Sequence, residues 1–363
     1  MKKILISGYH GLGNCGDEAI LAAIVNNLRK ADPDIKIVAL SRTPSETREK
    51  FRVKSVNRFN VFSIIYEMLS CNLVLSGGGS LLQDVTSSRS LYYYLGIIVM
   101  ARLLGRPVMV YANGIGPVRK RLNRFFTRLV LNRVSFITLR DKDSFRELYE
   151  MGVKRPQVLV SADPVFTMEA VSEVQAEQIL RNENIELQRP LIGISLRPWK
   201  NSSAWLRKIS LLADRLIDHF DCNILFLPMH IPNDAVVIEQ VRALMQKPSF
   251  AIQGSYSGEE MMGIIGHTRV IISMRLHTLI FAAVQRVPMI GLVYDPKVRS
   301  FLDAVGQPVA GDIDSLDVDE LFNILQEMLD NYEEMVQTLD EQAVRLKEKA
   351  HINDQMVMQL LKY

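Results

Sequence analysis

Short apolar segments alternate with longer amphipathic ones along the first half of the chain. This alternation is typical of strands and helices that build a parallel sheet covered by helices. The amphipathic segments include residues 18–31 and 122–133, which we predict to be helical. The predicted strands are residues 4–7, 35–40, 73–76, 108–112, 136–139 and 158–160.

The alternation stops at residues 169–190, which are polar and carry no strand pattern, and then starts again. The second series predicts strands at 191–196, 224–227, 250–252, 270–272 and 289–292. We therefore expect an α/β protein with two doubly wound, Rossmann-like parallel sheets in tandem. The expected domains are residues 1–168 and 169–345, followed by a helical tail at 346–363.

The last part of the chain has a helical pattern. Apolar side chains recur every three or four residues from Leu321 to Leu339, which predicts a long helix over about 316–349. Ser315 or Asp314 can cap its start. The polar residues at 351–354 are expected to interrupt this helix and to start a short final one.

Composition and charge narrow the class of protein. The chain has 363 residues, 48% hydrophobic and 23% charged, and its net charge of +3 does not suggest a nucleic-acid-binding protein. The cysteines Cys15, Cys71 and Cys222 are far apart and match no metal-binding spacing. The longest apolar stretch, residues 91–101, is shorter than the ~20 residues that span a bilayer. We expect a cytoplasmic protein without a metal ion.

Residues 11–16 form a literal G-x-G-x-x-G between the first predicted strand and helix. Backbone N–H groups in such a loop attract anions, so an NADP oxidoreductase is one interpretation, and Arg42 at the end of the second strand would suit it. However, Asp17 and Glu18 place two carboxylates where the anion should lie, and they are expected to cap the helix. The motif alone is weak evidence.

Two further loops of the first half follow predicted strands, where open α/β sheets bind ligands. One contains Gly78 and Gly79, and the other contains Asn113 beside glycines. Both can equally be tight structural turns.

Basic side chains gather after the strands of the second half. Arg197 and Lys200 follow one strand, Arg275 and His277 a second, and Lys297 a third. Arginines at strand ends bind carboxylates or phosphates, and a histidine at a helix start is suited to acid–base catalysis. The pattern predicts a small, multiply charged anionic ligand. Residues 201–203 are expected to cap the next helix.

Taken together, these loops resemble a known family. The ordered set is ISGYHGLGNCGDEAIL, LSGGGSLLQD, ANGIGP, DPVF, SLRPW, SMRLHTLIFAA and LVYDPK. It resembles the polysaccharide pyruvyl transferases over residues 3–300, and most of all the bacterial branch that acts on secondary cell-wall polymers and helps to anchor S-layer proteins.

The resemblance implies a fold and a reaction. The two Rossmann-like lobes would face a cleft, as in GT-B glycosyltransferases. The donor would be phosphoenolpyruvate, with no metal and no bound cofactor. The implied product is a pyruvate ketal across O4 and O6 of a terminal β-N-acetylmannosamine on a lipid-linked cell-wall intermediate, made at the inner face of the cell membrane.

The expected site residues follow from the motifs and this chemistry. His277 and Arg275 are expected to be catalytic, with His277 as the acid–base group. The residues expected to bind the donor are Arg197, Lys200 and Lys297. The residues expected to bind the acceptor sugar are His10, Asn14, Asp17, Gly78, Gly79 and Asn113. A nucleotide-sugar glycosyltransferase of the same architecture is the alternative, and it would bind a UDP or GDP sugar in the second lobe.

One helix suggests a membrane contact. The segment from Arg119 to Arg133 holds six basic residues and no acidic one, and Leu122, Phe125 and Leu129 form an apolar strip beside them. Basic amphipathic helices favour anionic membrane surfaces. A buried helix with a solvated basic face is the other interpretation.

Overall fold

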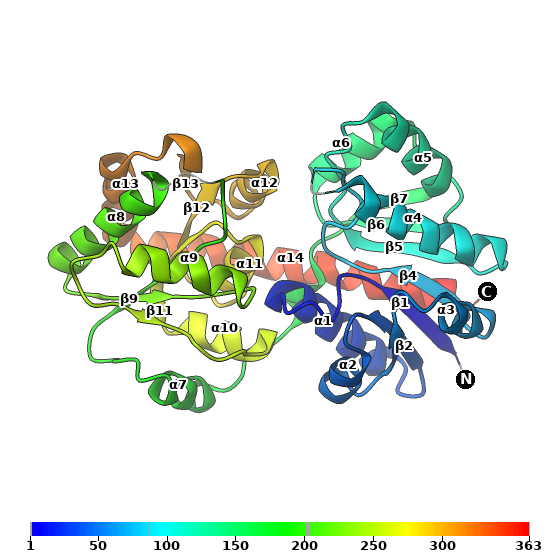
Figure 1. The fold of residues 1–363 in the computed structure, drawn as a ribbon, viewed down its shortest axis with the longest axis horizontal. Coiled ribbons are helices and arrows are strands. Elements are labelled where there is room, and N and C mark those ends of the chain that lie inside the picture. The colour runs from blue at the N-terminus through cyan, green and yellow to red at the C-terminus, as the bar shows by residue number, and fades with distance from the viewer. Residues whose placement is uncertain (1, 86, 201–203, 363) are drawn as a thin grey trace. The chain divides into compact units, whose positions relative to one another are not determined.

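A computed structural model describes residues 2–85, 87–200 and 204–362 of the chain (Figure 1). The chain divides into two compact units. Unit 1 comprises Met1–Met168 and Leu346–Tyr363, and unit 2 comprises Glu169–Arg345. Each unit is a parallel sheet covered by helices, as the alternating pattern predicts. The predicted caps at 201–203 lie outside the described residues.

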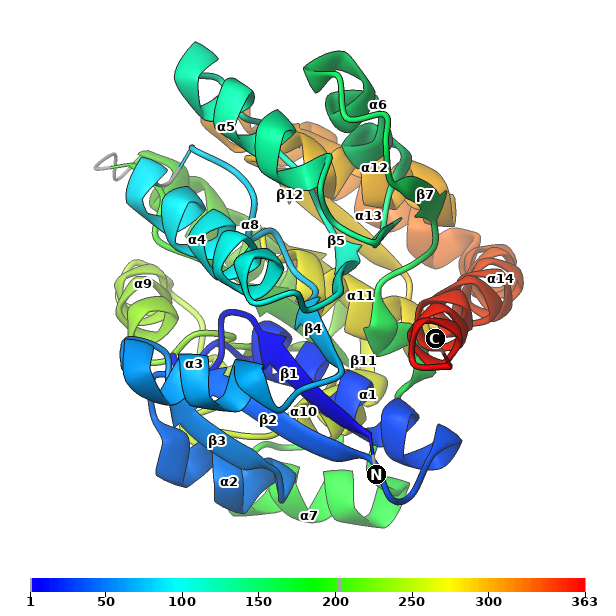
Figure 2. The same cartoon turned by 90° about the vertical axis from the view of Figure 1, so that its right-hand side faces the viewer.

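The sheet of unit 1 has seven parallel strands in the order β3-β2-β1-β4-β5-β6-β7. Parallel crossovers are right-handed. From β1 to β3 each new strand is added on one side of β1, and from β4 to β7 each is added on the other side. The helices α1 and α2 therefore cover one face of this sheet, and α3 to α6 cover the other (Figure 2). The strands are β1 (Lys3–Ser7), β2 (Lys36–Ser41), β3 (Lys54–Asn57), β4 (Leu73–Ser76), β5 (Val108–Asn113), β6 (Phe136–Leu139) and β7 (Gln157–Val160). The helices are α1 (Cys15–Ala31), α2 (Pro44–Phe51), α3 (Val61–Leu69), α4 (Ser88–Leu103), α5 (Arg121–Leu131), α6 (Lys142–Met151) and the 3₁₀ turn η1 (Pro164–Thr167).

The sheet of unit 2 has six parallel strands in the order β10-β9-β8-β11-β12-β13. Its core joins the sheet to the apolar faces of α8 and α13, including Trp205, Phe322 and Leu325. The strands are β8 (Leu191–Ser195), β9 (Asn223–Phe226), β10 (Phe250–Ala251), β11 (Thr268–Ser273), β12 (Met289–Val293) and β13 (Val309–Asp312). The helices are α7 (Glu173–Asn182), α8 (Ala204–Phe220), α9 (Asn233–Arg242), α10 (Gly258–Gly266), α11 (Leu276–Val284), α12 (Pro296–Val305), η2 (Ile313–Ser315), α13 (Val318–Asp330) and α14 (Tyr332–Leu360).

The long C-terminal helix is confirmed, but its predicted break is wrong. The chain breaks at Asn331, and α14 then runs without interruption through residues 351–354. The polar side chains there do not cap a new helix, because tertiary partners hold them. Asn353 donates to the carbonyl of Ala162, and Asp354 accepts from Asn27. The start of α13 is capped by Asp317, not by Ser315 or Asp314.

Candidate active site

The strand ends of unit 2 bring the predicted basic residues to one sheet edge. Ser195 at the end of β8 pairs with Ser273 at the end of β11, and Ser273 pairs with Gly291 in β12. Arg197 and Arg275 therefore each follow a paired serine by two residues. The two arginines leave neighbouring strands at the same edge.

A chain of buried hydroxyl groups fixes the start of α11 at this edge. The Thr278 hydroxyl donates to that of Ser195 at 3.0 Å, and the Ser195 hydroxyl donates to the Leu227 carbonyl at 2.8 Å. The Ser273 hydroxyl accepts the backbone N–H of Arg275 at 2.9 Å. These bonds tie α11 to β8 and β9, so His277, in the first turn of α11, is held at the carboxyl edge.

Arg197 carries a charge that no carboxylate neutralises among the described residues. Its Nη1 donates to the Tyr294 hydroxyl at 2.9 Å, and its guanidinium lies 4.6 Å from the centre of the Tyr294 ring. Tyr294 follows β12, and β11 lies between β12 and β8, so this contact passes over the end of β11. The Arg197 Nε is buried and has no hydrogen-bond partner in the described part of the chain. Arg197 can therefore bind an anion.

Arg275 is held by a buried acid whose role is not apparent from the sequence. Its Nη2 pairs with Oδ1 of Asp234, which is fully buried in the first turn of α9. The other oxygen of Asp234 accepts the backbone N–H groups of Met229 and His230, each at 3.0 Å. The carboxylate of Asp234 thus fixes Arg275 in place and offsets part of its charge.

The start of α11 is suited to an anion. Its N-cap residue is Arg275, whose side chain makes no capping hydrogen bond. Neighbouring α12, by contrast, is capped by Asp295, and α10 by Ser257. The N–H groups at a helix start and the helix dipole favour negative charge.

The two lysines predicted to bind the donor, Lys200 and Lys297, differ in exposure and in their contacts. Lys200 is exposed and pairs with Asp314 in η2, and Trp199 also donates to Asp314, at 3.0 Å. The hydrogen bonds from Lys200 and Trp199 lower the pKa of the Asp314 carboxyl. Lys297 is partly buried in the first turn of α12, where its backbone N–H is capped by Asp295. Donor binding by either lysine stays a prediction.

Two more residues at this edge were missed. His230 follows β9 and donates its backbone N–H to Asp234, so a second histidine lies beside the Arg275 ion pair. Tyr294 positions Arg197. The segment Leu227-Pro-Met-His230, directly after a strand, was the signal for His230.

In unit 1, backbone N–H groups of the glycine loop at residues 11–16 are bound by side chains of the same segment. Glu18 accepts the backbone N–H of Gly11 at 2.7 Å, and Asn14 accepts those of Gly16 and Asp17 at 3.1 and 3.3 Å. The helix cap is therefore Asn14, while Glu18 binds back to the loop. The backbone N–H groups of Gly11, Gly16 and Asp17 are therefore occupied, which disfavours the oxidoreductase interpretation.

His10 lies beneath this loop. Its side chain is 2% exposed, and its Nδ1 lies 3.2 Å from the carbonyl oxygen of Leu40. Burial lowers the pKa of His10 to about 4, and the nearby charge of Arg58 also lowers it, while the contact with Leu40 opposes this shift. His10 is therefore neutral at physiological pH. Contact with the acceptor by His10 stays a prediction.

The other predicted acceptor residues lie where β4 and β5 end. Asn113 is fully buried and donates to the carbonyls of Ser76 and Gly77, at 3.0 and 2.9 Å. Gly79 has a φ of +88°, and a Cβ built on it would lie 3.0 Å from the carboxylate of Asp17. A Cβ on Gly78 would lie 2.8 Å from Ile20. These glycines permit the close packing of the loop on α1, and their contact with a sugar stays a prediction.

Unit 1 also holds a buried ion pair at the carboxyl edge of its sheet. Arg140, after β6, pairs with Asp163 at 3.0 Å, and both side chains are buried. Arg140 also donates to the hydroxyl of Ser80 at 2.9 Å. Asp163 opens the DPVF segment, but its partner was not apparent from the sequence.

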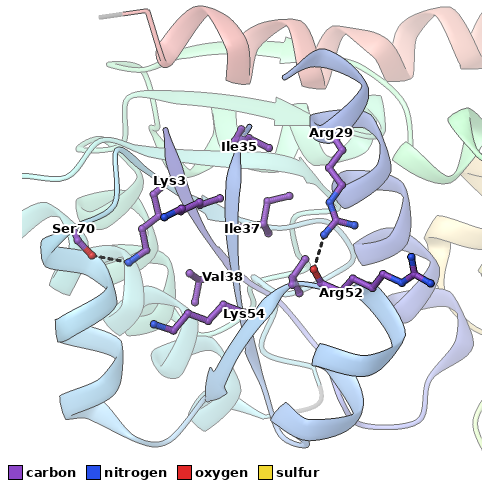
Figure 3. A pocket seen from close by; sticks show the side chains of 10 residues that line it. Lys3, Arg29, Ile35, Ile37, Val38, Arg52, Lys54 and Ser70 are labelled. Carbon is purple, nitrogen blue, oxygen red and sulfur yellow. Dashed lines mark hydrogen bonds between the residues drawn. The ribbon is translucent and has the colours of Figure 1, made fainter. Parts of the chain in front are cut away.

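A pocket of about 580 Å³ opens at the other edge of the same sheet, beside the amino ends of β1, β2 and β3 (Figure 3). Its basic side chains are largely paired. Lys3 and Lys54 both bind Glu67, and Arg29 donates to the carbonyls of Phe51 and Arg52. We attribute this pocket to the packing of α1 and α3 against the sheet edge.

Within the described residues, no helix is long and apolar enough to cross a membrane. The same residues contain no group of three or more His, Cys, Asp or Glu side chains that could hold a metal ion.

Comparison with known proteins gives two kinds of match. Residues 14–296 match the family model described as polysaccharide pyruvyl transferase. The amylovoran biosynthesis protein AmsJ of Erwinia amylovora is 21% identical over 409 aligned positions, which cover 96% of each chain.

Solved structures resemble the whole chain in fold. MnaA of S. aureus with UDP has a TM-score of 0.67 and 14% identity, and the match covers 100% of this chain and 96% of that one. HepE of Anabaena with UDP-glucose has a TM-score of 0.68 and 10% identity, with both chains fully covered. At these identities the likeness shows the fold alone, and it confirms the predicted GT-B-like architecture.

Proposed function

The chain belongs to the polysaccharide pyruvyl transferase family, and from this premise we propose that it forms a pyruvate ketal on the terminal sugar of a lipid-linked glycopolymer precursor. The family makes the chain a pyruvyl transferase enzyme that takes phosphoenolpyruvate as donor and a polysaccharide acceptor. The observation that carries the proposed site is the placement of Arg197, Arg275 and His277 at one sheet edge.

We assign the donor to unit 2. Phosphoenolpyruvate carries a phosphate and a carboxylate, and Arg197 and the amino end of α11 can bind one group each. Arg275, held by Asp234, is aligned beside them. Lys297 and Lys200 are further donor contacts in this proposal, although Lys200 would first have to leave Asp314.

The reaction needs one acid–base group, and we assign it to His277. His277 gives a proton to the methylene carbon of phosphoenolpyruvate, which leaves a cationic C2. One sugar hydroxyl bonds to C2 and returns its proton to His277. The bond from C2 to the phosphate oxygen then breaks, and phosphate leaves with the electron pair. The second hydroxyl bonds to C2, and its proton goes to the phosphate.

We assign the acceptor to unit 1, at the loop from His10 to Asp17, with Asn14, and at Gly78, Gly79 and Asn113. The proposed product is a 4,6-ketal on a terminal N-acetylmannosamine of a secondary cell-wall polymer precursor that serves S-layer anchoring. The reaction would take place in the cytoplasm at the inner face of the cell membrane. The similarity to the amylovoran biosynthesis protein AmsJ favours a second acceptor, a precursor of an amylovoran-like polymer.

The experiment is phosphate release from phosphoenolpyruvate in the presence of synthetic lipid-linked acceptors. One acceptor ends in N-acetylmannosamine, and others end in hexoses that have free O4 and O6. Acceptor-dependent release, with a ketal found by NMR, supports the proposal. Binding of a UDP sugar by thermal shift without any phosphate release would favour the glycosyltransferase alternative.

Two variants test the assignment of the acid–base group. We expect His277→Ala to lower kcat about 10²- to 10⁴-fold, the usual contribution of general acid–base catalysis. His267→Ala, directly before β11 and so at the opposite edge of the sheet, is the matched control and should retain most activity. Near-full turnover by His277→Ala would refute the assignment.

A further inference from the structure

Three helices on one face of the unit 1 sheet present apolar side chains to solvent. These positions recur at helical spacing, so each helix carries a continuous apolar stripe. Phe62 of α3 is 87% exposed, Leu103 of α4 is 82% exposed and Leu122 of α5 is 61% exposed. The stripes are Phe62, Tyr66 and Leu69 on α3, Tyr92, Val99 and Leu103 on α4, and Leu122, Phe125 and Leu129 on α5.

Ring contacts link the three helices. Tyr92 of α4 packs edge-on against Phe126 of α5 with ring centres 6.0 Å apart, and Phe126 packs against Phe125. Phe59, just before α3, packs against Tyr93 of α4 at 5.8 Å. We call the exposed apolar residues of α3, α4 and α5 the three-helix surface. Figure 2 shows the three helices that carry it. Apolar patches of this extent on a protein surface usually mark interaction sites.

The charges on the three helices are mostly positive, whereas the neighbouring helix α6 carries Asp143, Glu147 and Glu150, of which Glu147 pairs with Arg124. Residues 85–140 contain ten Lys or Arg residues and no Asp or Glu. Arg121 and Arg128 of α5 are exposed beside its apolar stripe. The one acid on the three helices, Glu67 of α3, is buried and paired with Lys3 and Lys54.

We propose that the three-helix surface docks this protein on an anionic lipid membrane. Exposed aromatic and aliphatic side chains would enter the headgroup region while arginines meet anionic lipid. A second copy of the chain is a poorer occupant, because a two-fold contact would place these positive surfaces against each other. The proposal extends the basic helix of the sequence analysis to α3 and α4, and it does not depend on the identity of the acceptor sugar.

The experiment is co-sedimentation of the full chain with vesicles of phosphatidylcholine alone or mixed with phosphatidylglycerol. We expect binding to the anionic vesicles at low salt and a marked loss as salt screens the charges. Arg121→Gln combined with Arg128→Gln should weaken binding about 25-fold, since each basic residue near such a surface contributes about fivefold. Phe62→Ser combined with Phe125→Ser should weaken it at every salt concentration.

Matched controls lie away from this surface. Arg207→Gln with Lys30→Gln makes the same charge change, and Val174→Ser with Val236→Ser removes exposed apolar side chains of unit 2. These controls should bind like the parent protein.

The proposal would be overturned if the protein did not sediment with anionic vesicles at low salt, or if the test and control variants lost binding equally. A dimer in solution that Phe62→Ser with Phe125→Ser converts to a monomer would assign the surface to a second copy instead. The readout needs no turnover, so failure here is distinct from failure of the proposed reaction.

Discussion

Two arginines at the carboxyl edge of unit 2 have different surroundings. Arg197 lies on the Tyr294 ring and has no acidic partner among the described residues, whereas Arg275 shares its charge with the buried carboxylate of Asp234. A cation with an aromatic neighbour keeps its full attraction for an anion, but a cation in an ion pair mainly keeps its position. We therefore expect Arg197 to supply binding energy and Arg275 to supply alignment.

This difference predicts the effect of Asp234→Asn. The amide can still accept the backbone N–H groups of Met229 and His230, but it cannot hold the Arg275 guanidinium by charge. We expect kcat/KM for phosphoenolpyruvate to fall about 10- to 100-fold, mostly in kcat, because the positioned group becomes misaligned. Steady-state kinetics on the folded variant, checked by thermal melting, measure this.

The control for Asp234→Asn is a double-mutant cycle with Arg275→Gln. If Asp234 acts through Arg275, the double variant should be little worse than Arg275→Gln alone, since residues that act as a unit are not additive. Losses that multiply would mean that the two residues act independently.

At the scale of elements, α14 is attached to unit 1 through a buried acid. Asp354 accepts from the Tyr111 hydroxyl at 2.5 Å and from Asn27 at 2.8 Å, and His351 lies 3.9 Å away. Burial raises the pKa of Asp354 from 3.8 to about 7, although both hydrogen bonds oppose the shift. The folded state therefore holds a proton that the unfolded chain has lost between these two values.

This proton makes stability depend on pH. The free energy of unfolding contributed by Asp354 is fully present below pH 4 and falls as pH rises towards 7. Relative to Asp354→Asn, the parent should lose up to about 1.4 kcal/mol for each pH unit in that interval. Urea unfolding at several pH values measures the difference. The comparison cancels His10, whose lowered pKa acts in the opposite direction. Parallel curves for the two proteins would contradict the prediction.

The elements that the sequence does not reveal have a common physical cause. The strands β3 and β13, KSVN and VAGD, lie at sheet edges, where one side lacks a neighbour and apolar residues are not required. The polar residues at 351–354 have the sequence of a helix break, but they are buried and held by residues nearly two hundred or more positions away. Local pattern cannot reveal such partners.

Some residues of the candidate site could be predicted from the sequence, and others could not, because only the fold shows their partners. Arg197, Arg275 and His277 follow buried strands directly, so their shared edge follows from parallel topology. Asp234 lies in the first turn of a helix, where an acid usually faces solvent, and only the fold shows that it is fully buried against Arg275.

At the scale of the whole molecule, the two units differ in how the chain builds them. Unit 2 is one continuous segment, whereas unit 1 needs residues 346–363 after the chain has completed unit 2. That returning segment contributes Ala350, Asn353 and Val357, all with 0% exposure. The stability of unit 1 therefore depends on a segment that follows unit 2 in the chain.

Deleting residues 346–363 should consequently destabilise unit 1 and leave unit 2 nearly unchanged. The deletion removes the fully buried Val357 and the partners of Asn27, Tyr111 and Ser161. One buried aliphatic side chain contributes about 1.5–3 kcal/mol, and each buried polar group left without a partner costs about 1–3 kcal/mol. Hydrogen exchange followed by mass spectrometry should show faster exchange in peptides from β1 to β7 than in the parent, with little change in β8 to β13.

The control is Val344→Ser, at an exposed position of the same helix in unit 2, and it should change the exchange of neither set of peptides. Equal acceleration in both sets would mean that the units do not unfold separately, and no acceleration would mean that the tail contributes nothing to unit 1.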